Sequence, residues 1–397
     1  MYRSALRWYA YRISSRIARW SRLGRPPAIS PLAFCFHRRP DALESFGATA
    51  VGFSADDQNL IARLVEAYQC VAQRQADIGD SMWKAFFLSR HQNIHRRLVE
   101  GNHSKVAEVL RDPASSDIFY GFDNLAASLL RPVDDIYRTY YDYQRFSPGP
   151  VLDDLVRLAE AIGAVRLENP EGYTRRAQQR YTVEATIAAL EAVFGFTLDF
   201  PNPFPGEFGL RSSRGVISYR ATHAVYQAWR ISQIMATVPN PRVLEIGGGL
   251  GRTALYARRF GITDYTIIDI PITSLAQGYF LGRVLGDDTV TLFGEEMPNS
   301  STLIKLLPPS SFLDSNDRYD LIVNVDSLTE MDPTVARAYW TQIDARSDAF
   351  LSINHEGNPF TVKQLIDGSS NVDCSSRVPA WMRNGYVEET VCLRPRR

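Results

Sequence analysis

The residues best suited to bind a ligand lie in one short stretch, between Val243 and Asp269. An apolar run ending at Ile246 is followed by a glycine-rich turn and by helical spacing from about Thr253, which predicts a strand, a turn and a helix. A second apolar run ends in Asp269, so a parallel strand would present a carboxylate at the same edge of the sheet. Glycines bring a ligand close to backbone amides, and an acid after the second strand suits a ribose diol. Both features serve dinucleotides and other adenosine compounds.

The spacing of the glycines separates these ligand classes. A dinucleotide turn needs a third small residue five places after its first glycine, and from Gly247 that position is Arg252, where we expect no close helix packing. The motif that is present reads Glu-x-Gly-x-Gly-x-Gly and consists of Glu245, Gly247, Gly249 and Gly251. It resembles motif I of class I methyltransferases that use S-adenosylmethionine (SAM), in which an acid also ends the second strand. A cationic sulfonium ligand without phosphates accounts for a carboxylate beside the turn, since it gains from a nearby negative charge.

Polar side chains also follow two later apolar runs, and parallel strands would bring them to the same edge as the glycine turn. The first run leads into Asn324, Asp326 and Glu330, and the second leads into Asn354 and His355. We assign Asn324 to the cofactor and Asn354 to the substrate. Ile270, directly after the acid of the second strand, is also assigned to the cofactor.

A set of stretches in the second half of the chain carries a family resemblance. They are Ile268–Pro271, Gln277 with Tyr279–Leu281, Asn324–Met331, Ser352–His355, and Trp381 with Asn384–Tyr386. Together they are similar to the bacterial sugar O-methyltransferases, most strongly from about 207 to 393 and more weakly over 100 to 200. The resemblance implies a SAM-dependent enzyme that methylates a hydroxyl of a sugar or glycan precursor. The sugar is implied by the family alone.

The reaction implied is a direct displacement in which a hydroxyl oxygen attacks the sulfonium methyl. Proximity supplies much of the rate, and a general base that takes the hydroxyl proton adds roughly 10²- to 10⁴-fold. We expect His355 to be that base, because imidazole titrates near neutral pH and this residue ends a strand at the ligand edge. Glu330 or Asp326 is the alternative base or orients His355, and a hydrogen-bonded structural histidine is the competing interpretation.

A long helix is expected from Ser218 to Thr237. Its Tyr219, Tyr226 and Arg230 are assigned to the substrate, because sugars are held by hydrogen bonds and aromatic faces. The alternative is that this aromatic stripe belongs to the core.

No metal site is predicted. Asp326, Glu330 and Glu356 are expected to converge, but they show no dedicated ligand spacing. His91 and His95 share a helical face without a third ligand, so two surface histidines are expected. Glu295 and Glu296 follow the third strand, where they approach the adenine or, as we expect, are solvated.

The elements that must position these residues form an α/β fold with a doubly wound, Rossmann-like sheet. Strands are expected at 243–246, 265–269, 289–293, 319–325, 349–354 and 386–393, the last one antiparallel. A helix is expected to begin at a capping box of Ser54 and Asp57. Further helices are expected at about 81–99, 104–111, 122–145, 151–163 and 173–194. We divide the chain into a basic N-terminal segment and linker (1–50), a helical accessory or lid region (51–200) and the SAM-binding domain (201–397).

Composition excludes several classes of protein. The chain has 397 residues and a formal net charge of zero, which argues against a general nucleic-acid binder. Its four cysteines lie far apart in sequence, so neither a zinc site nor a disulfide framework is expected, and a cytoplasmic location fits. Residues 1–24 form a basic amphipathic pattern, which indicates either peripheral contact with the inner face of a membrane or a terminal helix packed on its own domain.

Three functions remain open from the sequence. The first is a SAM-dependent O-methyltransferase, and the second is an NAD(P)-dependent oxidoreductase, which Arg252 and the lack of a Tyr-x-x-x-Lys pair disfavour. The third is a non-catalytic scaffold with the same fold. The sequence does not indicate the oligomeric state.

Overall fold

A computed structural model describes residues 46–48, 57–72, 87, 91–112, 148–167, 182–205, 207–296 and 302–394. The chain separates into two compact units, Met1–Phe46 and Gly47–Arg397, and nearly all described residues belong to the second. The amphipathic segment 1–24, most of the linker and the helix expected at 122–145 lie outside the described residues. Among those that are described, no helix is long and apolar enough to cross a membrane.

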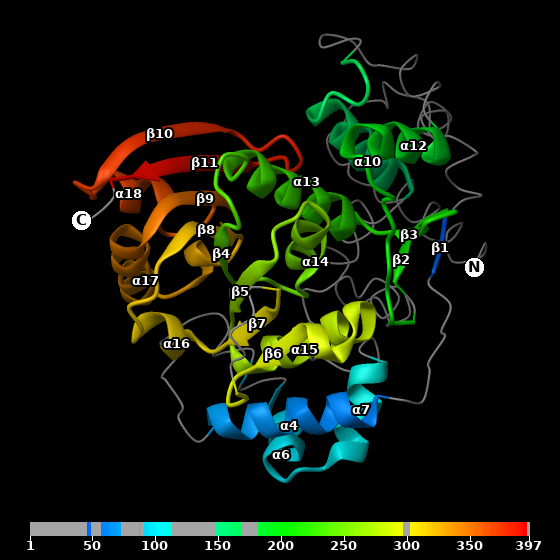
Figure 1. The fold of residues 1–397 in the computed structure, drawn as a ribbon, viewed down its shortest axis with the longest axis vertical. Coiled ribbons are helices and arrows are strands. Elements are labelled where there is room, and N and C mark those ends of the chain that lie inside the picture. Colours follow the sequence, from blue (N-terminus) through cyan, green and yellow to red (C-terminus); the bar gives the residue numbers. More distant parts are fainter. Residues whose placement is uncertain are drawn as a thin grey trace, which may run out of the picture. The chain divides into compact units, whose positions relative to one another are not determined.

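The centre of the second unit is an eight-stranded sheet with the order β10-β11-β9-β8-β4-β5-β7-β6 (Figure 1). Its strands are β4 (Arg242–Ile246), β5 (Asp264–Ile268), β6 (Val290–Leu292), β7 (Ile304–Leu307), β8 (Tyr319–Val325), β9 (Ser347–His355), β10 (Val372–Pro379) and β11 (Tyr386–Leu393). The six neighbouring strands β9, β8, β4, β5, β7 and β6 are all parallel, and β11 is antiparallel to both of its neighbours. The chain runs outward from β4 in both directions, so the sheet is doubly wound, as predicted, and its switch point lies beside β4.

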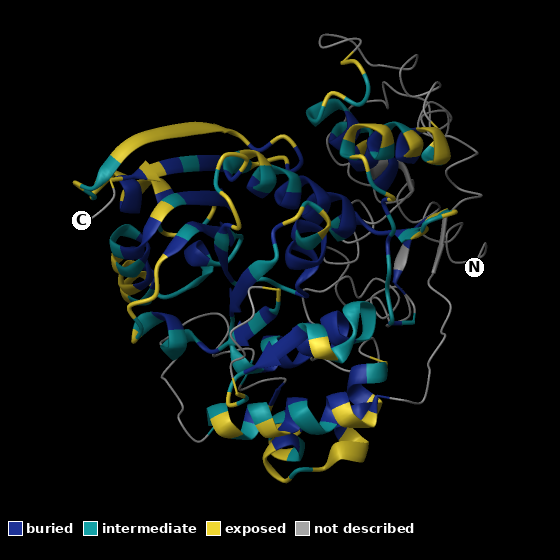
Figure 2. Cartoon of the chain, in the orientation of Figure 1, coloured by how far each residue is buried: buried dark blue, intermediate teal, exposed yellow. Residues whose placement is uncertain are grey.

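All six expected strands are present, including the antiparallel last one, but two further strands of the sheet were missed. β7 contains only four residues, directly before Pro308, so no periodic pattern could develop. β10 is exposed along almost its whole length and carries few apolar side chains (Figure 2). An apolar run is the main sequence signal for a strand, and β10 has none.

Helices cover both faces of the sheet. Alternate strand residues such as Leu244, Ile322 and Phe350 form one core cluster with α16 (Pro309–Leu313), α17 (Pro333–Arg346) and α18 (Val362–Asp367). α13 (Tyr219–Ile234), α14 (Arg252–Arg259) and α15 (Pro271–Leu285) belong to the other layer. Capping residues mark where some of these helices begin: the Ser218 hydroxyl caps α13, and Thr361 and Gln364 form a capping box on α18.

The helices that precede the sheet pack against two different parts of it. α4 (Gln58–Ala72), α6 (Gln92–Val99) and α7 (His103–Arg111) form one group, in which α4 lies along α15. α10 (Pro148–Ala161) and α12 (Val183–Phe194) form another, in which α10 packs on α13. β2 (Phe208–Ser212) and β3 (Gly215–Ile217) make an antiparallel pair near them, and β1 (Phe46–Ala48) is the first described element.

Two glycines allow α4 to approach α15 closely. A Cβ atom at Gly278 would lie 2.4 Å from the Leu64 side chain, and one at Gly282 would lie 2.8 Å from that of Leu60. A larger residue at either position would therefore require the facing leucine side chain to move or the two helices to separate.

Ion pairs fix the same helix group to the sheet. Buried Asp57 accepts hydrogen bonds from Arg111 and from the Tyr279 hydroxyl, so its carboxylate links α7 to α15; Ser54, the other member of the expected capping box, lies outside the described residues. Arg63 donates to Glu295 at 2.6 Å. Glu295 is therefore paired and only partly solvated, whereas Glu296 is exposed, as expected. The expectation of two surface histidines is wrong, because His91 is buried and the Tyr68 hydroxyl lies 2.8 Å from Nδ1 of His95.

Candidate active site at the carboxyl edge of the sheet

The glycine turn after β4 can be built only from glycine at several positions. Gly247, Gly249 and Gly251 all have positive φ, at 75°, 57° and 85°. A Cβ atom at Gly247 would lie 2.2 Å from the Ser327 hydroxyl, and one at Gly251 would lie 2.9 Å from Leu281. The turn is thus enclosed by the loop after β8 and by α15, and its backbone is held at the switch point of the sheet.

Glu245 lies directly beneath this turn. Its side chain is buried, and the Tyr265 hydroxyl donates to it at 3.0 Å. Burial raises the pKa of Glu245 to about 7, although the hydrogen bonds from Tyr265 and Thr253 act in the opposite direction. The carboxyl that the sequence placed beside the turn is therefore held by neutral donors only.

Asp269 stands at the end of β5, next to the same turn. Its carboxylate accepts hydrogen bonds from the backbone N–H of Ile270 at 2.8 Å and from Nε2 of Gln277 at 2.7 Å. Burial raises the pKa of Asp269 to about 7, and the negative charge of Glu245 contributes in the same direction. Part of the Asp269 surface nevertheless remains accessible. Gln277 is fully buried, and its role in holding Asp269 was not predicted.

Two asparagines tie the strand ends together. Asn324 donates through Nδ2 to the carbonyl oxygen of Ile246 at 2.9 Å, and Asn354 donates to Oδ1 of Asn324 at 2.8 Å. Both side chains are buried. Their amides join the ends of β4, β8 and β9, so the structure shows them bracing the edge of the sheet.

Asp326 is the centre of a polar cluster at this edge. It is one of two non-glycine residues with positive φ among the described residues, at 58°. Its Oδ2 accepts hydrogen bonds from Nη2 of Arg383 at 2.8 Å and from the Tyr386 hydroxyl at 2.9 Å. Burial alone would raise the pKa of Asp326, but the charge of Arg383 and the hydrogen bonds from Arg383 and Tyr386 keep it below the ordinary value.

The second carboxylate oxygen of Asp326 faces His355. Nε2 of His355 lies 3.7 Å from Oδ1 of Asp326, and Nδ1 of His355 accepts the backbone N–H of Gly357 at 3.2 Å. This pattern places the imidazole proton on Nε2, toward the carboxylate, and the lone pair on Nδ1. The structure therefore brings together two of the three residues that the sequence assigned to catalysis in a carboxylate–imidazole pair.

Glu330, in a 3₁₀ turn at Leu328–Glu330, completes that cluster. One potential ligand atom from each of Asp326, Glu330 and His355 lies within 4.8 Å of the others. The convergence expected from sequence named Glu356 in place of His355, and this is a correction: Glu356 instead pairs with Arg377 at 2.7 Å. A cation at the cluster would have to compete with Arg383, which already neutralises Asp326.

Arg383 is the functional residue that the sequence reasoning missed. Its side chain is 6% exposed and lies over the ring of Tyr386, with 3.6 Å between its Cζ and the ring centroid. The loop that carries it is fixed to α10, because Trp381 donates to the carbonyl oxygen of Arg157 at 2.9 Å. Trp381 and Tyr386, which flank Arg383, belong to the late stretch that carried the family resemblance. That resemblance was the only sequence signal that pointed to this loop.

The three residues assigned to the substrate from α13 are not equivalent. Tyr226 and Arg230 both donate to the buried carboxylate of Glu388 on β11, at 2.8 and 2.7 Å. Tyr219 lies beside His223, with 4.2 Å between ring centroids, and is close enough to Arg383 to contribute to the raised pKa of that guanidinium, against the effect of burial. Of the three, Tyr219 is the one that the structure connects to the Asp326 cluster.

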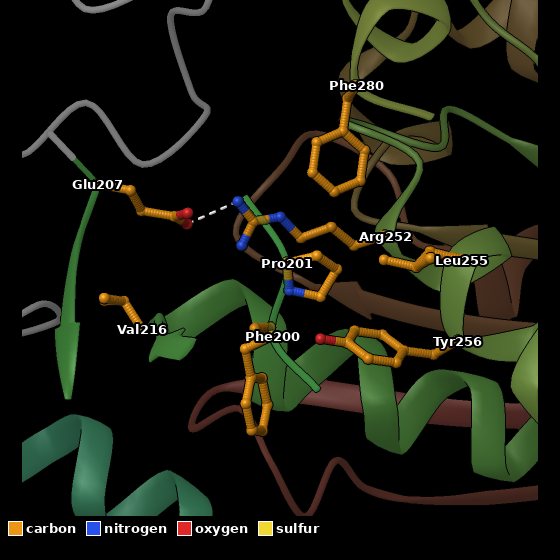
Figure 3. Close-up of a pocket in the computed structure, with 9 residues that line it drawn as sticks. Phe200, Pro201, Glu207, Val216, Arg252, Leu255, Tyr256 and Phe280 are labelled. Carbon is orange, nitrogen blue, oxygen red and sulfur yellow. Dashed lines mark hydrogen bonds and ion pairs between the residues drawn. The ribbon is translucent and has the colours of Figure 1, made fainter. Parts of the chain in front are cut away.

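Arg252 occupies the position where a dinucleotide turn would have a small residue and where no close helix packing was expected. Its long side chain fills this space: it is buried and lies over the ring of Phe280. It donates to Glu207 and to the Ser218 hydroxyl, each at 2.6 Å. Figure 3 shows the pair of Arg252 and Glu207 in a small cavity that none of the predicted site residues lines. Arg252 thus ties the start of α14 to α13 and the β2 segment.

Comparison with known proteins gives only distant similarity. No family model matches the sequence, and no curated protein does. Among solved structures, magnesium protoporphyrin IX methyltransferase from Synechocystis PCC 6803 shares 12% identity over 45% of this chain and 81% of its own, with a TM-score of 0.31. The glycopeptide N-methyltransferase MtfA shares 13% identity over 43% of this chain and 94% of its own, with a TM-score of 0.32. Ribosomal protein L11 methylase from Lactobacillus delbrueckii subsp. bulgaricus shares 14% identity over 44% of this chain and 80% of its own, with a TM-score of 0.29. Scores this low carry no conclusion about function.

The fold class follows from the sheet itself. The parallel strands diverge from β4, and one antiparallel strand, β11, is inserted between β9 and β10. This is a doubly wound, Rossmann-like sheet, and helices precede it in the chain.

Proposed function

We propose that this protein is a SAM-dependent O-methyltransferase that acts on a hydroxyl of a sugar or glycan precursor. The observation that carries the proposal is the pairing of two features at one edge of the sheet. A glycine turn flanked by Glu245 and Asp269 lies at the switch point, and the Asp326–His355 pair lies at the ends of the adjoining strands.

The residues around the turn fit SAM. Asp269 has accessible surface and is a hydrogen-bond acceptor suited to two ribose hydroxyls, and the glycines let the methionine part approach the backbone. Two acids held by neutral donors offer negative charge to a sulfonium. Bound SAM would supply an electrophilic methyl group on positively charged sulfur.

His355 is proposed as the general base that takes the proton of the acceptor hydroxyl. Nε2 of His355 faces Oδ1 of Asp326 at 3.7 Å, and Nδ1 accepts the N–H of Gly357, so in the neutral imidazole the lone pair that accepts the proton is on Nδ1. The acceptor hydroxyl would replace the 3.2 Å contact from the Gly357 N–H, which is long and exposed. Glu330 is the alternative base, since its carboxylate reaches the same cluster.

The acceptor class rests on the resemblance to sugar O-methyltransferases together with the polar side chains of Asp326, His355 and Tyr386 at this edge. Residues 1–24 lie outside the described part of the chain, and we keep for them the proposal of contact with an anionic membrane surface, where lipid-linked glycan precursors are assembled. Flotation with liposomes, with and without residues 1–24, tests this. Equal soluble fractions would rule it out.

A thermal-shift panel tests the donor. SAM and S-adenosylhomocysteine should each raise the melting temperature, because a ligand that binds only the native state stabilises it, while NAD and NADP should not. Stabilisation by NAD alone would instead favour the oxidoreductase. Transfer of labelled methyl to glycan precursors then separates an enzyme from a silent scaffold: a protein that binds SAM and labels none of them would be the scaffold.

A further inference from the structure

The hairpin of β10 and β11 brings together two cysteines that are distant in sequence. Cys374 and Cys392 are direct partners across the antiparallel pair. Both are free thiols and both are exposed. Their separation in sequence, from which no disulfide framework was expected, is thus bridged by the fold for these two.

The geometry of an antiparallel pair suits a covalent link. Directly opposed residues point to the same face, and their Cα atoms lie about 4.5 or 5.5 Å apart, depending on the type of pair. A disulfide needs a Cα separation of about 4.4 to 6.8 Å, so either type of pair falls within that range.

Two local features leave room for the small adjustment that a bond requires. The register shifts between Val372 and Cys374, so that Asp373 is an extra residue beside the pair. β10 is also the edge strand of the sheet, and its side chains are almost all exposed. A bulge at an exposed edge can move without disturbing the core.

The other cysteines do not compete for the pair within the described part of the chain. Cys70 lies near the end of α4, which packs against α15 and β6, and β6 is at the opposite edge of the sheet from β10. Cys35 lies outside the described residues. The thiol of Cys374 also interacts with that of Cys392, which together with burial raises the pKa of Cys392 to about 11.

We propose that Cys374 and Cys392 form a redox-active dithiol site, which low-molecular-weight disulfides such as oxidised glutathione convert to an intramolecular disulfide. One S–S bond forms between the two cysteines and the S–S bond of glutathione breaks. The two cysteines lose two electrons and two protons, which appear as two glutathione thiols. The link fastens β10 to β11 at the end of the hairpin opposite to the loop that carries Arg383.

The test uses the full chain, incubated with oxidised glutathione at about pH 8.5, where more thiolate is present than at neutrality. Trypsin cleaves after Arg377 and Arg383, which lie between the two cysteines, so their peptides separate unless a disulfide joins them. We expect the joined pair of peptides in the mass spectrum, its loss on adding dithiothreitol, and protection of two of the four thiols from alkylation.

Matched variants show whether the pair is specific. Cys374→Ser and Cys392→Ser should each abolish the joined peptides, and Cys70→Ser should leave their yield unchanged. Separate glutathione adducts on Cys374 and Cys392, or a link from either one to Cys70 or Cys35, would overturn the proposal. None of these results depends on methyl transfer, so they are independent of the proposed function.

Discussion

The carboxyls on the two sides of the site have opposite pKa shifts. On the side proposed to bind the methyl donor, Glu245 and Asp269 accept hydrogen bonds only from hydroxyl, amide and backbone groups, and burial raises the pKa of each carboxyl to about 7. On the acceptor side, Asp326 is partly buried, which would also raise its pKa, but the charge of Arg383 keeps that pKa below the ordinary value. Burial therefore does not decide the charge of a carboxyl; the partner does.

This difference matches what each side has to do. A carboxyl that lacks a cationic partner in the protein gains most from a cationic ligand, which is what the donor side is proposed to bind. A carboxyl that orients an imidazole must remain ionised throughout the reaction, and Arg383 secures this for Asp326. The following changes test whether the two sides are separate.

The largest effect is expected from His355→Gln. Loss of a general base should lower kcat about 10²- to 10⁴-fold, while the SAM dissociation constant stays within about threefold of the wild-type value. Steady-state kinetics and calorimetric SAM binding measure the two sides separately. Glu356→Gln is the control, because Glu356 is adjacent but pairs with Arg377. Turnover within about threefold of wild type in His355→Gln would refute the base assignment.

Asp269→Asn should produce the reciprocal pattern. Hydrogen bonds to a charged group contribute about 1.5 to 3 kcal/mol, so the loss should raise the SAM dissociation constant about 10- to 100-fold. Asp326→Asn, the matched change on the acceptor side, should leave this constant nearly unaltered and lower kcat. If both variants weaken SAM binding equally, the two sides are not separate.

The central strands could be predicted from sequence because their signals are local. β8 is a mostly apolar run, and both β8 and β11 were predicted at the bounds that the structure shows; the glycines with Asp269 form a motif within one crossover. The antiparallel last strand followed from the class of fold.

The partners of the charged residues could not be predicted, because each contact joins distant parts of the chain. Arg383 reaches Asp326 across 57 positions, and Tyr226 reaches Glu388 across 162. Their residue types suit a surface or a substrate equally well. Only the fold shows that Tyr226 is committed to a buried carboxylate and that Arg383 stands at the site.

The pH dependence of SAM binding should reveal the donor side. Below about pH 7 the Asp269 and Glu245 carboxyls of the free protein are largely protonated, and a cationic ligand must displace a proton to gain their charge. The dissociation constant should therefore fall as the pH rises from 6 to 7, by up to about tenfold for each proton released, and level off above that. Calorimetry in buffers of different ionisation enthalpy counts the protons. A flat profile would show that the acids stay ionised in the free protein.

The smallest effects should be shifts of opposite sign in the melting temperature of the ligand-free protein. The folded-state pKa of Glu245 is raised, so its ionisation costs stability as the pH rises from the ordinary carboxyl value to about 7, and the cost is complete above that. Glu245→Gln should then melt a few degrees higher than wild type at about pH 8 and differ little at about pH 5. The folded-state pKa of Asp326 is lowered, so its stabilisation is present above the ordinary value and is lost on acidification. Asp326→Asn should melt lower than wild type at about pH 8, and the gap should narrow in acid. Shifts of the same sign in both variants would mean that Arg383 does not set Asp326 apart from the donor-side acids.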